Sequence, residues 1–280
     1  MTICLATACD CFNPDTNPKL VLVADQMIST GTSYSLGPKI SKIASSWFAM
    51  TAGDDVTEAE NVLAWARKDI DQLADAPARS VTKAVKEAYR KRRIERIEDI
   101  YLRPYSWDMN LFLREGRNAL GEAMFERMKY EMDTFSLGFD LLICGFEGLK
   151  HKTPAFATVS NPGVVAAKTF PGNYVALGSG APNATSYLDW RRQAQRTDLS
   201  ETVYNCIAAK AMSESALGIG KETSVLIVEC TEGFPRKLLN PWKIQDIREI
   251  WENEEANIRP DNLKERIAAV IDPSADSPNA

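Results

Sequence analysis

The sequence has 280 residues, of which 45% are apolar and 25% are charged, and its formal net charge is −5. This composition is typical of a soluble globular protein, and the length suffices for one large domain or two small ones. The sequence has no basic stripe with interleaved aromatic residues, no apolar run long enough to cross a bilayer, and no signal peptide. We therefore expect neither a nucleic-acid partner nor a membrane partner.

Six cysteines and a single histidine narrow the chemistry further. Most of the cysteines lie in apolar segments, where a thiol behaves as a small hydrophobic side chain. Cys9 and Cys11 are too close together for ordinary zinc spacing, so we expect no metal and no cofactor. Such cysteine usage fits a reducing, cytoplasmic compartment. His151 is predicted in a loop, so the base of a hydrolytic reaction would be another group.

The beginning of the chain combines a strand pattern with a threonine. Residues 2–8 read as a β-strand, and Thr2 directly follows Met1. Thr2 is small enough for Met1 to be removed without any propeptide cleavage, which would leave a threonine with a free α-amine. A hydroxyl needs a base to become a good nucleophile, and an α-amine with an ordinary pKa of about 7.7–8.0 can serve within the same residue. Many proteins start with Met-Thr and have no such role, so later signals must decide.

A second strand follows a turn-rich segment. Residues 19–24 form a continuous apolar run that would pair with the first strand as a hairpin, and Asp25 ends it. A carboxylate at the end of a buried strand is either a turn residue or a group that faces a positive partner. Residues 27–38 are small and polar and predict a loop.

The next segment places a lysine before a strand. Alternation of polar and apolar residues predicts a short strand in which Lys39, Ser41 and Ile43 share one face. Residues 47–52 form another strand, and Gly53 follows it, where the backbone can turn sharply and leave an N–H open. Lys39 is either an ordinary solvated strand-end lysine or a charge supplied to a site.

A long helical block separates two groups of strands. Asp55, with an acidic residue three positions later, predicts the N-cap of a helix to about residue 73. Ser80 can cap a second helix towards residue 100, and residues 111–128 predict a third.

Strand patterns return after the helical block. The predicted strands are residues 139–145, 156–159, 164–168, 174–177, 223–230 and 235–239. The predicted helices are residues 183–191, 198–217, 243–253 and 261–271. Between them lies Gly178-Ser179-Gly180, which is an ordinary turn or, less plausibly without a following P-loop lysine, a phosphate-binding loop.

Consecutive hairpins imply antiparallel sheets, and two sheets packed face to face between helices would bury every apolar strand. We therefore predict an α+β fold with four αββα layers. Residues 1–240 would form the main domain, with a helical insertion at about 80–130. Residues 241–271 would be a helical C-terminal extension, and 272–280 a disordered tail.

The order of these pieces resembles the proteasome β-subunit branch of the N-terminal nucleophile (Ntn) hydrolases. The segments that carry the resemblance are residues 2–6 (TICLA), 21–25 (VLVAD), 39–43 (KISKI), 52–53 (AG), 141–146 (LLICGF) and 175–180 (VALGSG). They recur in the family's order over roughly residues 2–240, which is most of the chain.

The resemblance implies a role for each of five residues. Thr2 would be the nucleophile, with its own α-amine as base. Lys39 would favour the alkoxide-like state of the Thr2 hydroxyl, and Asp25 would hold Lys39 charged and oriented. The N–H of Gly53 would stabilise the oxyanion, and Ser179 would hydrogen-bond near the terminal amine.

The resemblance also implies a threonine endopeptidase that acts on peptides or unfolded protein within a homo-oligomeric ring, and it allows an ATPase unfoldase as a partner. The sequence departs from the family after residue 212, where a late Asp and Ser are expected and only Ser213 or Ser215 could substitute. Two alternatives stay open: an Ntn amidase or acyl-transfer enzyme acting on a small amide, and a non-catalytic structural subunit of a similar assembly.

Overall fold

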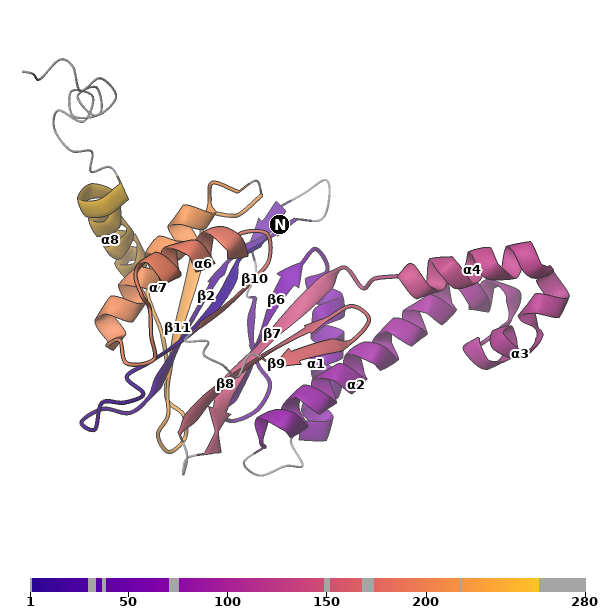
Figure 1. Cartoon of the computed structure of the whole chain (residues 1–280), viewed down its shortest axis with the longest axis horizontal. Helices are drawn as coiled ribbons and strands as arrows, with labels where there is room; N and C mark the ends of the chain where they lie inside the picture. The colour runs from indigo at the N-terminus through magenta and orange to yellow at the C-terminus, as the bar shows by residue number, and fades with distance from the viewer. Residues whose placement is uncertain are drawn as a thin grey trace, which may run out of the picture.

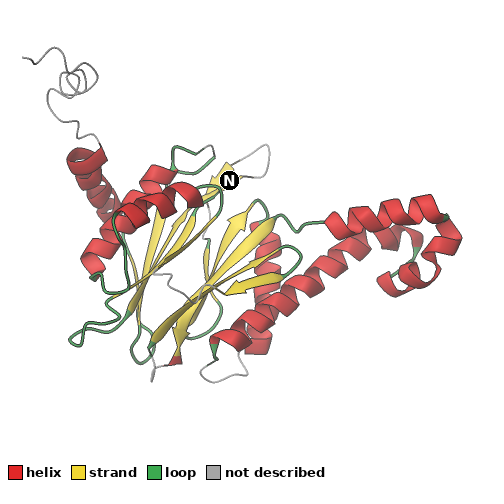
Figure 2. Ribbon diagram, viewed as in Figure 1, coloured by secondary structure: helices red, strands yellow, loops and turns green. Residues whose placement is uncertain are grey.

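Two antiparallel five-stranded sheets stack face to face, and helices cover the outer face of each (Figure 1, Figure 2). The structure is a computed structural model that describes residues 2–29, 34–36, 39–70, 76–148, 152–167, 174–216 and 218–256. The predicted α+β class and αββα layering are confirmed. None of the helices in these ranges has the length and apolarity needed to span a bilayer.

The first sheet contains the first strand of the chain near its middle. Its strand order is β10 (Tyr174–Leu177), β1 (Cys4–Cys9), β2 (Lys19–Asp25), β11 (Thr223–Glu229) and β12 (Arg236–Leu238). The predicted β1–β2 hairpin is present, with Cys4 opposite Ala24. This register brings the start of β1 beside the end of β2, and therefore brings Thr2 beside Asp25.

The second sheet has the order β5 (Ile40–Lys42), β6 (Trp47–Gly53), β7 (Phe139–Glu147), β8 (Thr153–Ser160) and β9 (Val164–Ala167). Leu22 of the first sheet and Phe48 and Leu142 of the second lie in the apolar layer between the sheets, and each is at most 1% exposed. Full burial of such a side chain contributes about 1.5–3 kcal/mol. This layer fixes how the two sheets face each other.

Five helices form the outer layers. The first sheet is covered by α6 (Ala181–Trp190), α7 (Leu199–Ser213) and α8 (Pro241–Trp251), and the second by α1 (Val56–Ile70) and α2 (Ala78–Ile97). The predicted N-cap of α1 is present, because Asp55 accepts from the N–H of Glu58 at 2.9 Å, and Asp198 caps α7 in the same way by accepting from the N–H of Glu201 at 3.0 Å.

A helical arm, formed by residues 94–134, projects from the sandwich (Figure 1). It comprises the end of α2, a π-helix (Glu98–Leu102), a 3-10 helix (Arg103–Tyr105), α3 (Met109–Leu120) and α4 (Glu122–Thr134). Its own small core contains Phe112 and Phe125, whose rings stack with centroids 4.8 Å apart. The arm is therefore packed largely on itself.

Three predicted elements differ from the structure. The single helix predicted at 111–128 is two helices, because Gly121 between them has a φ of +77° that breaks the helical path. The second helix starts at Ala78 rather than at a Ser80 cap, with Pro77 at the N-cap. The loop predicted at 27–38 contains β3 (Met27–Ser29) and β4 (Tyr34–Leu36), which pair with each other.

Three predictions fall outside the described residues. They are the loop position of His151, the helix at 261–271 and the disordered tail at 272–280. The neighbouring prediction of a helix at 243–253 corresponds to α8, which begins two residues earlier at Pro241.

Candidate active site

Thr2, Asp25 and Lys39, here called the Thr2 cluster, meet at one end of the two sheets. Their residues are 2%, 0% and 2% exposed, respectively. Thr2 lies two residues before the start of β1, Asp25 ends β2, and Lys39 directly precedes β5 of the second sheet. The N–H of Asp25 donates to the carbonyl of Ile3 at 3.2 Å, which continues the β1–β2 pairing up to the cluster. The cluster thus spans both sheets.

The Asp25 carboxylate accepts most of the hydrogen bonds in the cluster. Its Oδ1 accepts from the Thr2 hydroxyl at 3.1 Å and from the N–H of Ile3 at 2.9 Å. Lys39 Nζ donates to both Asp25 carboxylate oxygens at 3.0 Å, and it also donates to Thr2 Oγ1. The hydroxyl therefore lies between an ammonium and a carboxylate, where a positive charge can stabilise the developing alkoxide.

Burial makes the two charges of the cluster depend on each other. A buried ion pair gains little net stability, but removal of one partner leaves an uncompensated charge and typically costs about 3–5 kcal/mol. Asp25 and Lys39 have side chains that are 0% and 1% exposed, so each fixes the position of the other. Their geometry is consequently restrained before any substrate arrives.

The turn after β10 lies against the main chain of Thr2. The Thr2 nitrogen donates to Ser179 Oγ at 3.2 Å, and the N–H of Gly180 donates to the Thr2 carbonyl at 3.3 Å. With Met1 attached, that nitrogen is a peptide group. Gly178 has a φ of +101°, and a Cβ on it would lie 2.3 Å from the Thr2 carbonyl oxygen, so glycine is needed for this close approach.

Gly53 lies at the end of β6, next to elements that hold the cluster. Two residues earlier, the N–H of Thr51 donates to the Lys39 carbonyl at 3.0 Å, and the Thr51 carbonyl accepts from Cys4 Sγ at 3.3 Å. Gly53 itself has a φ of +148°, and a Cβ there would lie 2.3 Å from the Gly138 carbonyl oxygen. The glycine is therefore required by the backbone path.

The predicted shared face of Lys39 and Ser41 is wrong. Lys39 reaches towards the first sheet, whereas Ser41 Oγ bonds to Glu60 of α1 and Ile43 packs in the core beneath α1 and α2. The reason is that β5 begins at Ile40, so Lys39 lies outside the strand and does not follow its alternation.

The two serines considered as substitutes for late family residues have different positions. Ser213, fully buried at the end of α7, donates to the carbonyl of Gly180 at 3.0 Å, whereas Ser215 is exposed and accepts from Asn183 at 3.0 Å. Sequence reasoning missed Lys210, which is 1% exposed in α7. Its sequence signal is a lone lysine within the apolar stretch of that helix.

A cysteine nucleophile is disfavoured at this site. Cys4 lies two residues after Thr2 and is fully buried, and burial raises the pKa of its thiol to about 12. Lys39 opposes this shift, and Asp25 adds to it. Cys4 is therefore a neutral thiol at physiological pH, while the thiolate is the nucleophilic form.

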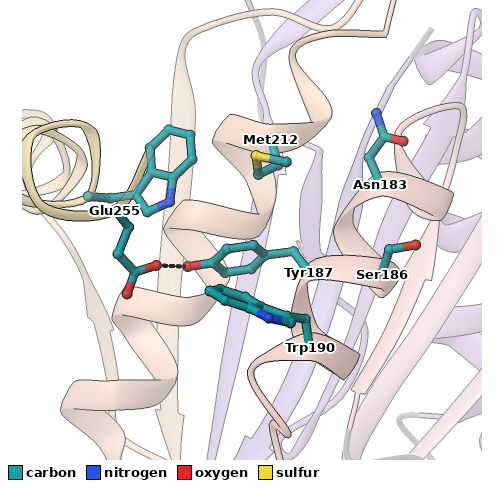
Figure 3. A pocket seen from close by; sticks show the side chains of 7 residues that line it. Asn183, Ser186, Tyr187, Trp190, Met212 and Glu255 are labelled. Atoms are coloured by element: carbon teal, nitrogen blue, oxygen red, sulfur yellow. Dashed lines mark hydrogen bonds between the residues drawn. The ribbon is translucent and has the colours of Figure 1, made fainter. Parts of the chain in front are cut away.

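A pocket of about 440 Å³ lies elsewhere, among the helices over the first sheet (Figure 3). Its lining residues are Asn183, Ser186, Tyr187, Trp190, Met212, Trp251 and Glu255. The Tyr187 hydroxyl points at Glu255 and donates to it at 2.8 Å (Figure 3). Burial and this hydrogen bond raise the pKa of Tyr187, so the phenol stays neutral and offers no base. The Thr2 cluster has the better arrangement for catalysis.

Comparison with known proteins shows similarity in fold. No protein-family model matches the sequence, and no curated protein matches it. Among solved structures, the Anbu (Gly-1) mutant from Hyphomicrobium sp. strain MC1 matches with a TM-score of 0.60 and 14% identity. The match covers 96% of this chain and 97% of that one. The two proteins therefore share their architecture over nearly the whole chain, including the sheets that position the Thr2 cluster.

Proposed function

We propose that this protein is an Ntn hydrolase, a threonine-type peptidase that uses Thr2 as its nucleophile after removal of Met1. One observation carries the proposal. The buried Thr2 hydroxyl accepts a hydrogen bond from the Lys39 ammonium and donates one to the Asp25 carboxylate at 3.1 Å. This arrangement lies at the residue that would bear the free α-amine.

The reaction would proceed through an ester. The Thr2 hydroxyl attacks the carbonyl carbon of an amide bond and transfers its proton to its own α-amine, directly or through a water molecule. The positive charge of Lys39 favours the alkoxide-like state, and Asp25 keeps Lys39 oriented. The α-ammonium passes this proton to the amine leaving group, which departs, and water, with the α-amine again as base, then hydrolyses the acyl ester and regenerates Thr2.

Two further groups complete the proposed mechanism. The N–H of Gly53 would stabilise the oxyanion of the tetrahedral intermediate, a contribution of about 3 kcal/mol in other hydrolases. Ser179 Oγ, 3.2 Å from the Thr2 nitrogen, would hold the free amine in place once Met1 is gone. The position of the turn against Thr2 supports this role for Ser179.

The decisive test is the intact mass of the purified protein before and after treatment with a peptide epoxyketone, which captures both a hydroxyl and an adjacent amine. We expect loss of Met1 and one adduct per chain, with no adduct on Thr2→Ala. Thr7→Ala is the matched control, because Thr7 is also a buried threonine, in β1, and is 0% exposed. Reaction of Thr2→Ala at the wild-type rate would show that the proposed nucleophile is wrong.

The same experiments distinguish the remaining functions. Cleavage of fluorogenic peptides supports the peptidase, whereas reaction with the epoxyketone and turnover of only small amides would indicate an amidase or acyl-transfer enzyme. Retained Met1 with no adduct would indicate a structural subunit. The burial of an aspartate, a lysine and a threonine together favours the catalytic alternatives, because a scaffold does not require this combination.

We further propose that the protein works as a homo-oligomer, in a ring that an ATPase unfoldase could serve. Exposed apolar side chains on the outer helices and the arm support association, such as Trp190 at 68%, Leu113 at 58% and Tyr130 at 70% exposure. Native mass spectrometry of the purified protein tests it, and a monomer at micromolar concentration would contradict it.

A further inference from the structure

We propose that Lys210 is a positioning residue for the Thr2 cluster, acting from the outer helical layer through the chain segment that leads into β11 and through its own charge. The inference rests on the proposed function of the cluster. Lys210 touches neither Thr2 nor Lys39 in the hydrogen bonds of the structure, so its action is indirect.

The Lys210 ammonium donates three hydrogen bonds, two to main-chain carbonyls and one to a carboxylate. It donates to the carbonyls of Gly220 and Lys221, each at 2.7 Å, and to the carboxylate of Glu214. A methionine of similar length would fill the same space without the cost of burying a charge. What lysine alone supplies here is a set of hydrogen bonds to two main-chain carbonyls, together with a positive charge.

The segment held by Lys210 packs against the end of β2. The carbonyl of Glu222 accepts from the N–H of Gln26 at 3.1 Å, and Thr223 pairs with Asp25 in the sheet. A Cβ on Gly220 would lie 2.6 Å from Cβ of Met27, so the segment approaches the chain closely just after Asp25. A shift of residues 220–222 would therefore move the backbone that carries the Asp25 carboxylate.

The same end of α7 also holds the turn on the other side of Thr2. The hydroxyl of Ser213, three residues after Lys210, is shared between the carbonyls of Ala209 at 2.8 Å and Gly180 at 3.0 Å, and the N–H of Gly180 in turn donates to the Thr2 carbonyl at 3.3 Å. One helix end thus holds two segments, one beside Asp25 and one beside Thr2. This makes α7 a rigid support for both.

Lys210 also interacts electrostatically with Asp25 of the cluster. Burial lowers the pKa of Lys210, while Glu214 and, more weakly, Asp25 counteract the shift and Arg248 adds to it. Glu214 is itself shared, because Arg248 of α8 donates to its two oxygens at 2.8 and 2.7 Å. Arg248 is in turn paired with Glu252 at 2.7 Å, so the two cations of this network face two carboxylates, and the charge of Lys210 reaches Asp25 only as a weak electrostatic interaction.

The test compares the rate of epoxyketone adduct formation across pH for the wild type and Lys210→Met. We expect a rate about tenfold lower, the loss that corresponds to one buried charged hydrogen bond, with one adduct per chain retained. Because a nearby positive charge is lost, the acidic limb of the pH profile should move upward by about half a pH unit. A role confined to stability would change the folded fraction and leave this midpoint in place.

Lys19→Met is the matched control. Lys19 is 14% exposed and pairs with Asp10 at 3.0 Å, at the opposite end of β2 from Asp25, about 20 Å away. Its loss should leave both the rate and the midpoint unchanged. An unchanged rate and midpoint in Lys210→Met, with a reactive wild type, would overturn this inference alone. A wild type that forms no adduct would overturn the proposed function, and this inference with it.

A second variant decides the case in which Lys210→Met does not fold. Arg248→Gln removes the two bonds to Glu214 and the bond to Glu252 at 2.7 Å, and it leaves Lys210 in place; the Arg248 side chain is 20% exposed, so folding should persist. We expect a rate about threefold lower and a midpoint shifted in the same direction, since a positive charge near Glu214 is lost. No change in either quantity would then overturn the inference.

Discussion

Lys39 Nζ donates to both carboxylate oxygens of Asp25 at 3.0 Å; Asp25 ends a strand of the first sheet, and Lys39 directly precedes a strand of the second. The ion pair is therefore a bridge across the sandwich, placed where the chain begins. Neither charge reaches solvent, so the pair can hold the Thr2 hydroxyl in one geometry.

Replacement of Asp25 by asparagine should damage both stability and reactivity. The amide nitrogen would face the Lys39 ammonium, which would lose its counter-charge while it remains buried. We expect the free energy of unfolding to fall by about 3–5 kcal/mol, as measured by urea denaturation. Adduct formation at Thr2 should be lost in the folded protein.

Asp10→Asn provides the matched control for that experiment. Asp10 pairs with Lys19 at the other end of β2, and its side chain is 7% exposed. We expect some loss of stability but unchanged adduct formation. Wild-type reactivity in Asp25→Asn would contradict the role given to Asp25.

Alanine at Gly53 tests the proposed oxyanion donor. The φ of +148° and the 2.3 Å approach to the Gly138 carbonyl oxygen mean that the end of β6 must shift. If the Gly53 N–H stabilises the oxyanion, the adduct rate of the folded protein should fall by about 10²–10³-fold.

The control for Gly53 is Gly145→Ala. A Cβ on Gly145 would lie 2.5 Å from the Ser46 carbonyl oxygen, and Gly145 pairs with Trp47 at the far end of β6. Both variants should be destabilised, as measured by thermal unfolding, but only Gly53→Ala should slow adduct formation. Equal rates in the two would argue against Gly53 as a donor.

Ser179→Ala should lower the adduct rate by about tenfold without changing the stoichiometry, because one hydrogen bond to the Thr2 nitrogen is lost. The initial rate of mass change measures the effect. Ser215→Ala is the comparison, since Ser215 is exposed and bonds to Asn183 and the Met212 carbonyl. A slower reaction in Ser215→Ala of the same size would show that the effect is not specific to Ser179.

Arg92→Met should reveal a pH-dependent ion pair between α1 and α2. Arg92 donates to the two carboxylate oxygens of Glu58 at 2.5 and 2.8 Å, and this hydrogen-bonding is the main cause that lowers the pKa of Glu58 from its ordinary 4.5. A lowered carboxyl pKa stabilises the fold above pH 4.5, and this contribution is lost as pH falls through the folded-state value.

We therefore expect Arg92→Met to reduce the free energy of unfolding by about 1 kcal/mol at neutral pH, since the pair is partly screened by solvent. The difference from wild type should shrink in acid. Urea denaturation at about pH 7 and about pH 3 measures it. Lys83→Met, which removes an exposed pair with Glu87 at 3.8 Å, should show no comparable change. A difference that stays constant with pH would contradict the ion-pair explanation.

Much of the fold follows from local signals in the chain. Apolar runs predicted the strands of both sheets, and Asp55 and Asp198 cap helices because a carboxylate can accept from N–H groups at a helix start. The break at Gly121 was missed because a single glycine within a helical pattern is often tolerated. The pairing of β3 with β4 was missed because small polar residues favour turns more than strands.

The residues of the candidate site were harder to predict from the sequence than the strands were. Thr2, Asp25, Lys39 and Ser179 were selected from a family order, and the structure brings these four together. Lys210 could not be selected in this way, because its partners are carbonyls of residues 220 and 221 that only the folded chain places beside it. The prediction that Lys39 shares a strand face with Ser41 was wrong for a related reason. Lys39 lies before the strand begins, so the alternation of side chains along the strand does not apply to it.

We expect that the arm can be shortened without disturbing the sandwich, because its core is packed largely on itself. Arg93 donates to the carbonyls of Phe135 at 3.0 Å and of Met132 and Asp133 at 2.8 Å each, so the chain enters and leaves the arm at adjacent points. A short turn across this gap would preserve the register of β6 with β7. We therefore expect that the length of the arm can change while the distances around Thr2 stay constant.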